Sequence, residues 1–307
     1  MEPLNIVFMG SPDFAVPSLE KLHNSIHTIQ AVVSNPDKRR GRRGKPEPTA
    51  VKKKALELNL PTIDVEDVKS TEFRDQLAAI KPDLLVVVAF RILPQPILEI
   101  PKIGSVNLHA SLLPKYRGAA PIHWAIINGE EKTGCTVFFL NEKVDTGNII
   151  DTVETPIGPL DNTGDLYNRL KDTGSNLLIT CLDKISAGNY SLKEQDDSKA
   201  TPAPKLFKEN TKIDFHQDAR TVHNFVRGLN PFPGAWCTYN SQKMNIYRTK
   251  PVKAVNIDLG ILQFSDKQLL AGCSKGAVEL LEVQLSGTKV MSGADFANGY
   301  DINARLR

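Results

Sequence analysis

The sequence of 307 residues is poor in cysteine, in aromatic side chains and in long apolar runs, and it carries little net charge. Its four cysteines lie 36 or more residues apart, so none has the close spacing of zinc sites or redox dithiols. We therefore expect buried thiols and no bound metal. No apolar run approaches the roughly 18 residues that span a bilayer, which excludes an integral membrane protein.

The amino-terminal segment MEPLNIVFMG lacks the basic region and the extended apolar stretch of a secretory signal. A cytoplasmic location is the expectation that follows. Glycine and proline number 20 each and 24% of the residues are charged, which are ordinary values and exclude a disordered or fibrous chain. At about 150 residues per domain, the length predicts two domains.

Short apolar runs alternate with amphipathic helical patterns over the first 188 residues. The longest run, DLLVVVAF at 83–90, fits the centre of a parallel sheet covered on both faces. The expected strands are 4–10, 29–33, 83–90, 104–109 and 134–140, and the expected helices are 16–22, 48–60, 70–80, with Ser70 as its cap, and 162–188. This alternation predicts right-handed βαβ units and a doubly wound, mostly parallel, Rossmann-like α/β sheet.

The pattern changes after a polar, proline-interrupted stretch at 189–208, which we interpret as a linker. Beyond it lie about five short strand candidates separated by turn residues. They are 236–239, 244–249, 252–257, 269–272 and 277–283. The sequence therefore predicts a domain at 1–188, a linker at 189–208 and a small OB-like β-barrel domain at 209–307.

The small net charge of +3 hides an uneven distribution. Residues 209–307 hold twelve Lys and Arg against nine Asp and Glu, whereas 1–208 hold 26 of each. Within the neutral part, the segment 34–47 carries six cations against two acids, spaced by glycines. Such a loop can follow a phosphate backbone, although on its own the run favours a solvated charged loop.

Candidate catalytic groups follow the strands expected at 104–109 and 134–140. Ligands of open α/β sheets bind outside the carboxyl ends of the strands. Asn107 and His109 are two residues apart on an extended segment, so their side chains face the same side. The amide can stabilise an oxyanion and the imidazole can move protons, while Asp145 can orient the imidazole. Taken singly, His109 also fits a core histidine and Asn107 a turn residue.

The nucleophile for a covalent mechanism is missing from this pattern. No Ser or Cys lies in a nucleophile elbow, and Cys135 has no evident base. The segment GSPDFA at 10–15 lacks the second glycine of a dinucleotide fingerprint, so NAD binding is not expected. The residues instead favour direct group transfer without a covalent enzyme intermediate.

Several motifs carry a resemblance to a known family. They are MGSPDFAVP at 9–17, FRILP at 90–94, NLHASLLPKYRG at 107–118, DTG at 145–147 and NPFPGA at 230–235. Together they span essentially the whole chain and resemble the methionyl-tRNA formyltransferase family. The set Asn-x-His…Asp with Ser-Leu-Leu-Pro resembles the motif of the wider 10-formyltetrahydrofolate-dependent formyltransferase superfamily. The opening segment, the basic loop and the C-terminal barrel resemble its tRNA-specific members.

The resemblance implies transfer of a formyl group from 10-formyltetrahydrofolate to the α-amino group of methionyl initiator tRNA, for translation initiation. Asn107 would bind the oxyanion, His109 would shuttle a proton from the amine toward N10, and Asp145 would hold His109. The folate would lie at Ser111, Leu112, Leu113, Pro114, Arg91, Ile92 and Leu93. No metal is implied.

The resemblance also implies that the basic loop engages the tRNA acceptor arm. The loop cations are Lys38, Arg39, Arg40, Arg42, Arg43 and Lys45. In the C-terminal part, Lys243 and Arg248 are tRNA-contact candidates that also fit a solvated barrel surface. We expect Phe232 and Trp236 to be core residues rather than base-stacking platforms. A monomer without membrane contact is expected.

Two other readings share the same catalytic residues or the same basic loop. The first is another folate enzyme, such as a formyltransferase for a sugar nucleotide or purine precursor, or a formyl hydrolase. The second is an RNA-binding protein without activity. The basic loop and the C-terminal domain argue against the former, and the intact Asn107, His109 and Asp145 against the latter.

Overall fold

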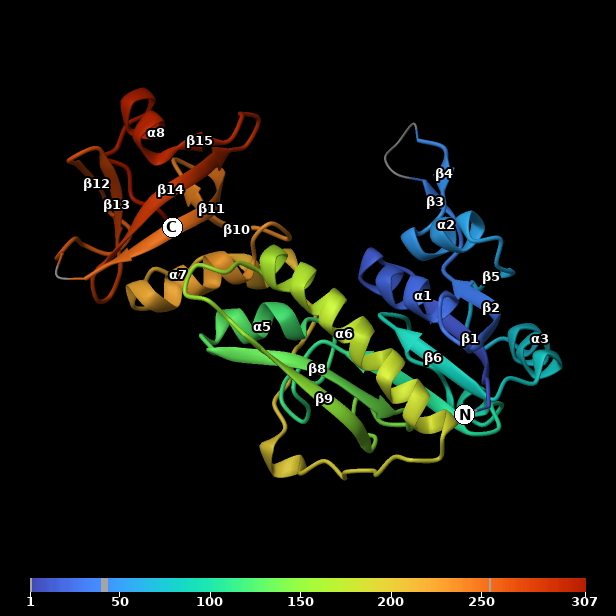
Figure 1. Cartoon of the computed structure of the whole chain (residues 1–307). Coiled ribbons are helices and arrows are strands. Elements are labelled where there is room, and N and C mark those ends of the chain that lie inside the picture. The colour runs from blue at the N-terminus through green and yellow to red at the C-terminus, as the bar shows by residue number, and fades with distance from the viewer. Residues whose placement is uncertain (1, 40–43, 254) are drawn as a thin grey trace. The chain divides into compact units, whose positions relative to one another are not determined.

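The computed structural model describes residues 2–39, 44–253 and 255–307 (Figure 1). The chain forms two compact units. The first comprises Met1–Gly118, Thr133–Thr155 and Tyr167–Pro202, and the second comprises Ala119–Lys132, Pro156–Leu166 and Ala203–Arg307. Each unit is described by itself below.

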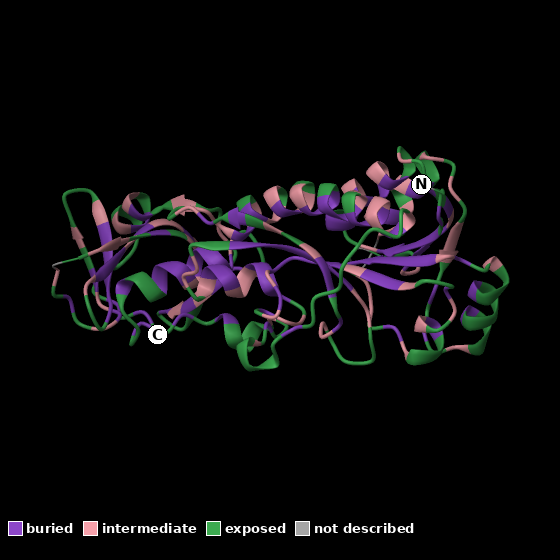
Figure 2. Cartoon of the chain, turned by 60° about the horizontal axis from the view of Figure 1, so that its bottom comes forward, coloured by how far each residue is buried: buried purple, intermediate pink, exposed green. Residues whose placement is uncertain are grey.

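A seven-stranded sheet forms the first unit. Its order is β5 (Thr62–Asp64), β2 (Thr28–Ser34), β1 (Asn5–Gly10), β6 (Leu84–Val88), β7 (Gly104–His109), β8 (Lys132–Phe139) and β9 (Ile149–Pro156). The pairs from β5 to β7 are parallel and β7 pairs with β8 antiparallel, which confirms the mostly parallel α/β expectation. All five residues of β6 are buried, as a central strand covered on both faces requires (Figure 2).

Helices cover the two faces of this sheet. They are α1 (Val16–His23), α2 (Ala50–Glu57), α3 (Thr71–Ile80), α4 (Gln95–Leu98) and α6 (Thr163–Ser186). The side chain of Ser70 accepts a hydrogen bond from the Phe73 amide, so the expected cap of α3 is confirmed. Gly174 lets α6 approach the sheet, because a Cβ there would lie 2.9 Å from the Cys135 sulfur and 3.2 Å from Leu108.

The alternation along β7 therefore assigns its two faces. Leu108 points toward α6, so Asn107 and His109 lie on the opposite face. That face also carries Val87 of β6, which packs with Phe73 of α3 and Ile97 of α4. The two candidate catalytic side chains therefore lie on the face of the sheet that also packs with α3 and α4.

Two short strands form in the basic loop: β3 (Lys38–Arg39) pairs antiparallel with β4 (Pro46–Glu47). Lys38, Arg39 and Lys45 are exposed. The predicted tRNA contacts Arg40, Arg42 and Arg43 lie outside the described residues. The part of the loop that the structure describes is thus a hairpin base with its cations in solvent.

An antiparallel sheet dominates the second unit. Its path is β10 (Ala235–Tyr239), β11 (Gln242–Val252), β14 (Ala277–Leu285), β13 (Gln268–Gly272) and β12 (Leu262–Ser265), with β15 (Met291–Ser292) on β14. The helices are α5 (Pro121–Ile127), α7 (Ala219–Gly228) and α8 (Gly293–Gly299). This arrangement agrees with an OB-like domain. The strand expected at 244–249 is confirmed as part of β11, which runs from Gln242 to Val252. The strand expected at 252–257 is wrong, because β11 ends at Val252 and the described residues 253 and 255–257 form no strand.

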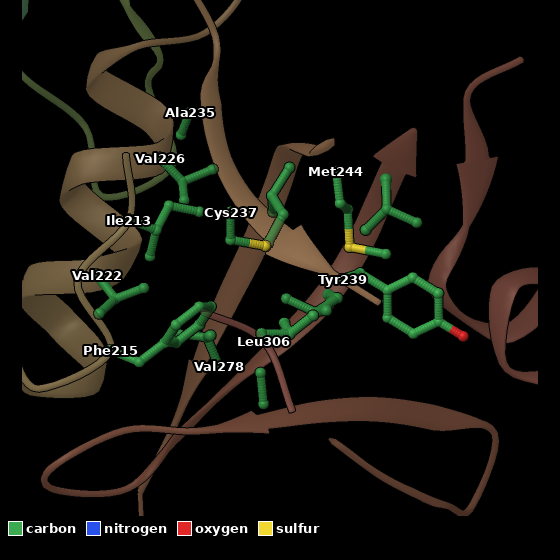
Figure 3. Close-up of a cluster of buried hydrophobic side chains, with 14 of the residues drawn as sticks. Ile213, Phe215, Val222, Val226, Ala235, Cys237, Tyr239, Met244, Val278 and Leu306 are labelled. Carbon is green, nitrogen blue, oxygen red and sulfur yellow. The ribbon is translucent and has the colours of Figure 1, made fainter. Parts of the chain in front are cut away.

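The core of the second unit lies between α7 and this sheet. Val222 and Val226 of α7 belong to one buried cluster with Cys237 and Tyr239 of β10 and Met244 of β11 (Figure 3). All four cysteines of the chain are free and buried. Burial raises the pKa of the Cys135, Cys181 and Cys237 thiols to about 12 and that of Cys273 to about 11. None is therefore a ready nucleophile at neutral pH.

The stretch expected to be a linker is ordered along much of its length. Lys193 exchanges backbone hydrogen bonds with Ile149 of β9. The Arg117 amide donates to the Thr201 carbonyl at 2.9 Å, and the segment through Pro202 belongs to the first unit. Residues 189–202 therefore follow the strands and loops of the first unit closely, despite their polar composition.

Candidate active site

His109 ends β7 and is fixed by a backbone carbonyl. Its Nε2 lies 2.8 Å from the carbonyl oxygen of Tyr116, and its Nδ1 lies 3.7 Å from Oδ2 of Asp145. A carbonyl only accepts hydrogen bonds, so Nε2 must carry a proton. The lone pair of the neutral ring is then on Nδ1, on the side of Asp145. An incoming proton adds at Nδ1, where the carboxylate stabilises the imidazolium.

Asp145 occupies a loop between β8 and β9 whose backbone is tightly specified. Asp145 has φ of 54°, the left-handed region that non-glycine residues avoid. Its Oδ2 accepts a hydrogen bond from the Gly118 amide at 2.8 Å. A Cβ at Gly147 would lie 1.7 Å from the Phe139 carbonyl oxygen, so only glycine fits there. The loop therefore holds the carboxylate close to His109.

Asn107 lies two residues before His109 on β7, so both side chains are on the same face of the sheet. In the neighbouring strands it pairs with Val87 of β6 and Phe138 of β8. Its side chain is half-buried, and no described residue hydrogen-bonds its amide group. The amide is thus free to donate to a ligand. The structure thus places His109 and Asp145 within ion-pair distance of each other. It leaves the Asn107 amide, on the same face of the sheet as His109, available to a ligand.

The segment Ser111–Pro114, predicted to bind folate, is anchored by Thr136 of β8. Thr136 Oγ1 donates to the Ser111 carbonyl at 2.7 Å and accepts from the Leu113 amide at 3.1 Å. Ser111 Oγ donates to the Lys115 carbonyl at 2.7 Å. Leu113 packs against Phe138. The side chains of Ser111 and Leu113 thus serve the protein interior, whereas Leu112 and Pro114 are half-buried.

The second predicted folate segment, Arg91–Leu93, divides its side chains between interior and solvent. Arg91 donates to Asn35 Oδ1 at 2.6 Å and to the carbonyls of Val65 and Glu66 at 2.5 Å. Leu93 is buried, while the Ile92 side chain is 71% exposed. The guanidinium of Arg91 is occupied by neighbouring loops, and Ile92 is the apolar side chain open to a ligand.

The predicted tRNA contacts of the second unit have different surroundings. Lys243 lies over the ring of Trp236, with Nζ 5.5 Å from the ring centroid, and Lys208 and Lys212 lie at 5.9 and 5.7 Å. Arg248 pairs with Glu282 at 2.9 Å. The cations around Trp236 therefore form a cluster, whereas Arg248 is neutralised.

A cavity of about 500 Å³ adjoins this cluster. Its lining includes His123, Lys205, Phe207, Lys208, Phe232 and Lys243.

Phe232 is 78% exposed, so the prediction that it belongs to the core is wrong, and Trp236 is only half-buried. We name the group formed by Trp236, Lys208, Lys212 and Lys243 the Trp236 cluster. The turn through the proline-rich segment 230–235 leaves Phe232 facing solvent, which apolar patterning alone does not reveal.

The described residues hold neither a candidate metal site nor a helix that could span a membrane. Within residues 2–39, 44–253 and 255–307, no three His, Cys, Asp or Glu side chains gather in a group that could hold a metal ion. Among the helices in this described part, none is long and apolar enough to cross a membrane.

The chain is similar to known proteins over nearly its whole length. Residues 4–182 match the family described as formyl transferase, and residues 205–301 match the formyl transferase C-terminal domain. A methionyl-tRNA formyltransferase of Chlorobium limicola is 44% identical over 97% of this chain and 96% of the relative. One of Flavobacterium johnsoniae is 41% identical over 97% of both.

Solved structures share the fold at lower identity. The sugar 3N-formyltransferase WlaRD is 20% identical, with a TM-score of 0.67 over 94% of this chain and all of that one. HypX of Aquifex aeolicus in complex with tetrahydrofolic acid is 17% identical, with a TM-score of 0.66 over 99% of this chain and 51% of that one. These likenesses concern the fold alone.

Proposed function

The chain belongs to the methionyl-tRNA formyltransferase family, and on that premise we propose that it transfers the formyl group of 10-formyltetrahydrofolate to methionyl initiator tRNA. The products are N-formylmethionyl-tRNA and tetrahydrofolate. Beside family membership, the observation that carries the proposal is the pairing of His109 with Asp145 next to the open amide of Asn107. No covalent enzyme intermediate is needed.

The folate supplies the formyl carbon and, through N10, the leaving group. His109 serves the proton transfer that the exchange of amines requires. Its Nδ1 takes the proton that the α-amino group loses as the new C–N bond forms, and returns it to the departing nitrogen as the old C–N bond breaks. Asp145 stabilises the transient imidazolium, because its carboxylate oxygen lies 3.7 Å from Nδ1.

Asn107 serves the charge that develops on the formyl oxygen. Its amide donates a hydrogen bond to the oxyanion, and its place on a strand paired on both sides fixes the direction of that bond. Residues Ser111–Pro114 and Arg91–Leu93 hold the folate chiefly through backbone groups and through the exposed side chain of Ile92. The inward-facing side chains of Ser111 and Leu113 support this division.

The tRNA contacts are proposed on two basic surfaces. The hairpin cations Lys38, Arg39 and Lys45, together with Arg40, Arg42 and Arg43, engage the acceptor arm. In the second unit, Lys243 contacts tRNA as part of the Trp236 cluster, whose lysines suit phosphate groups and whose ring suits an unpaired base. Arg248 contributes less, because Glu282 neutralises it. The enzyme acts as a monomer in the cytoplasm.

The test compares amine acceptors under one set of conditions. Purified protein is incubated with 10-formyltetrahydrofolate and either charged initiator or charged elongator methionine tRNA. We expect rapid formylation of the initiator species and little of the elongator. Formylation of an amino-sugar nucleotide in place of tRNA, or release of free formate alone, would refute the proposal. A His109→Ala variant controls for contaminating activity.

A further inference from the structure

Gln195 is a buried polar residue in an exposed, extended segment. Every other residue from 187 to 199 is exposed, whereas Gln195 is 9% exposed. A polar side chain becomes buried at a cost unless its hydrogen-bonding groups are satisfied. The partners of this amide therefore indicate why the chain turns inward at this one position.

All four hydrogen-bonding positions of the Gln195 amide are occupied. Its Oε1 accepts from Nε and a terminal nitrogen of Arg117 at 3.1 and 2.8 Å. Its Nε2 donates to the carbonyls of Asp145 and Gly147 at 2.9 and 2.8 Å. A guanidinium only donates and a carbonyl only accepts, so the orientation of the amide is unambiguous.

Gln195 thereby ties together the two loops that hold His109. The loop with Arg117 contains Tyr116, whose carbonyl fixes Nε2 of His109. The other loop carries Asp145, whose carboxylate faces Nδ1. Tyr116 and Asp145 have φ of 61° and 54°, so both loops need outside contacts to keep these backbone conformations.

We propose that Gln195 is a positioning residue for formyl transfer, which clamps the Tyr116 and Asp145 loops in the relative position that the His109–Asp145 pair requires. The inference rests on the proposed function and extends it to a segment whose composition resembles a linker. Gln195 does not touch the reacting atoms. It acts through the loop carbonyls of Asp145 and Gly147, and its effect therefore falls on turnover and not on substrate binding.

Two substitutions separate this role from its alternatives. Gln195→Met keeps the length and removes all four hydrogen bonds. Gln195→Glu keeps an acceptor for Arg117 but cannot donate to the Asp145 and Gly147 carbonyls. We expect both variants to lose about 10- to 100-fold in kcat, the scale of loss from a small misplacement of catalytic groups, with KM for each substrate within about twofold.

Asp197→Asn is the matched control. Asp197 also contacts Arg117, at 2.7 Å, but it is exposed and touches neither loop carbonyl, so we expect an unchanged kcat. A double-mutant cycle adds a readout that a general loss of structure would not give. In a His109→Ala background, Gln195→Met should cost almost nothing further, because the clamp acts through His109.

Wild-type kcat in both Gln195 variants would overturn the inference. Wild-type kcat in Gln195→Glu alone would also overturn it, because the residue would then only anchor Arg117. If Gln195→Met does not fold, Gln195→Glu carries the test, since it retains the Arg117 contact. A wild-type protein that formylates another amine refutes the proposed function instead, and the same variants are then compared in that reaction.

Discussion

The two units of the molecule hold their functional candidates in opposite ways. In the first unit, backbone atoms of Tyr116 and Gly118 fix His109 and Asp145, which are largely buried. In the second unit, the Trp236 cluster presents long lysine side chains around a half-buried ring. Proton transfer needs fixed distances, whereas attraction to phosphates tolerates mobile charges. Substitutions at His109 or Asp145 should therefore affect turnover, whereas substitutions in the Trp236 cluster should affect tRNA affinity.

The largest effect is expected at His109. Replacing it with alanine removes the proton carrier, and kcat for formylation should fall by about 10²–10⁴-fold or more. Single-turnover rates with saturating folate and tRNA measure this loss. His216→Ala is the control, because His216 is an exposed histidine of the second unit paired with Asp214. Full activity in His109→Ala would remove His109 from the mechanism.

Asn107→Ala should come next, with a loss in kcat of about 10²–10³-fold, the usual cost of removing one oxyanion donor. Binding of both substrates should change little, because the amide acts only on the charge that develops during reaction. A loss that appears in KM for folate instead of in kcat would assign Asn107 to substrate binding.

Removing the positive charges of the Trp236 cluster should weaken tRNA binding and leave turnover unchanged, the opposite of the effect at His109. With Lys208, Lys212 and Lys243 changed to alanine, we expect KM for tRNA to rise about tenfold with an unchanged kcat. The slope of log affinity against log salt should fall by about two to three, roughly one for each phosphate that the variant no longer neutralises.

The matched control removes the same charge from other exposed positions of the second unit, by changing Lys267, Lys275 and Lys289 to alanine. If this variant weakens tRNA binding equally, net charge and not the cluster accounts for the attraction. If the cluster variant retains its salt slope, the cluster lies outside the tRNA interface.

The smallest effect is expected at Arg248. Its ion pair with Glu282 already satisfies the guanidinium, so Arg248→Ala should change KM for tRNA by less than about twofold. Lys243→Ala, made beside it on β11, should have the larger effect. The reverse order would show that the Glu282 pair opens when tRNA binds.

Local sequence patterns were enough to predict part of the site. Strand alternation predicted that Asn107 and His109 share a face, and the burial of β6 follows from its apolar run. The tie between Gln195 and the Asp145 loop joins residues about 50 positions apart, which no local pattern reveals. The polar, proline-interrupted composition around Gln195 is typical of a linker, so its one inward side chain could not be recognised.

Aromatic residues showed the same limit in the second unit. Phe232 was predicted to be buried because large apolar side chains usually are, but the turn through 230–235 exposes it. The lysines around Trp236 come from β11 and from the segment before α7, and only the folded chain brings them to one ring. The sequence identifies the lysines as cations, but it does not reveal that lysines from separate segments meet at one ring.

The four buried cysteines give the molecule a built-in probe of how each unit opens. Cys135 and Cys181 belong to the first unit, and Cys237 and Cys273 to the second. A thiol-specific reagent added to the native enzyme reaches them only when their own unit transiently unfolds. The order in which the four sites are alkylated, resolved by mass spectrometry, then reports the separate local stabilities of the unit that carries His109 and the unit that carries the Trp236 cluster, without any engineered label.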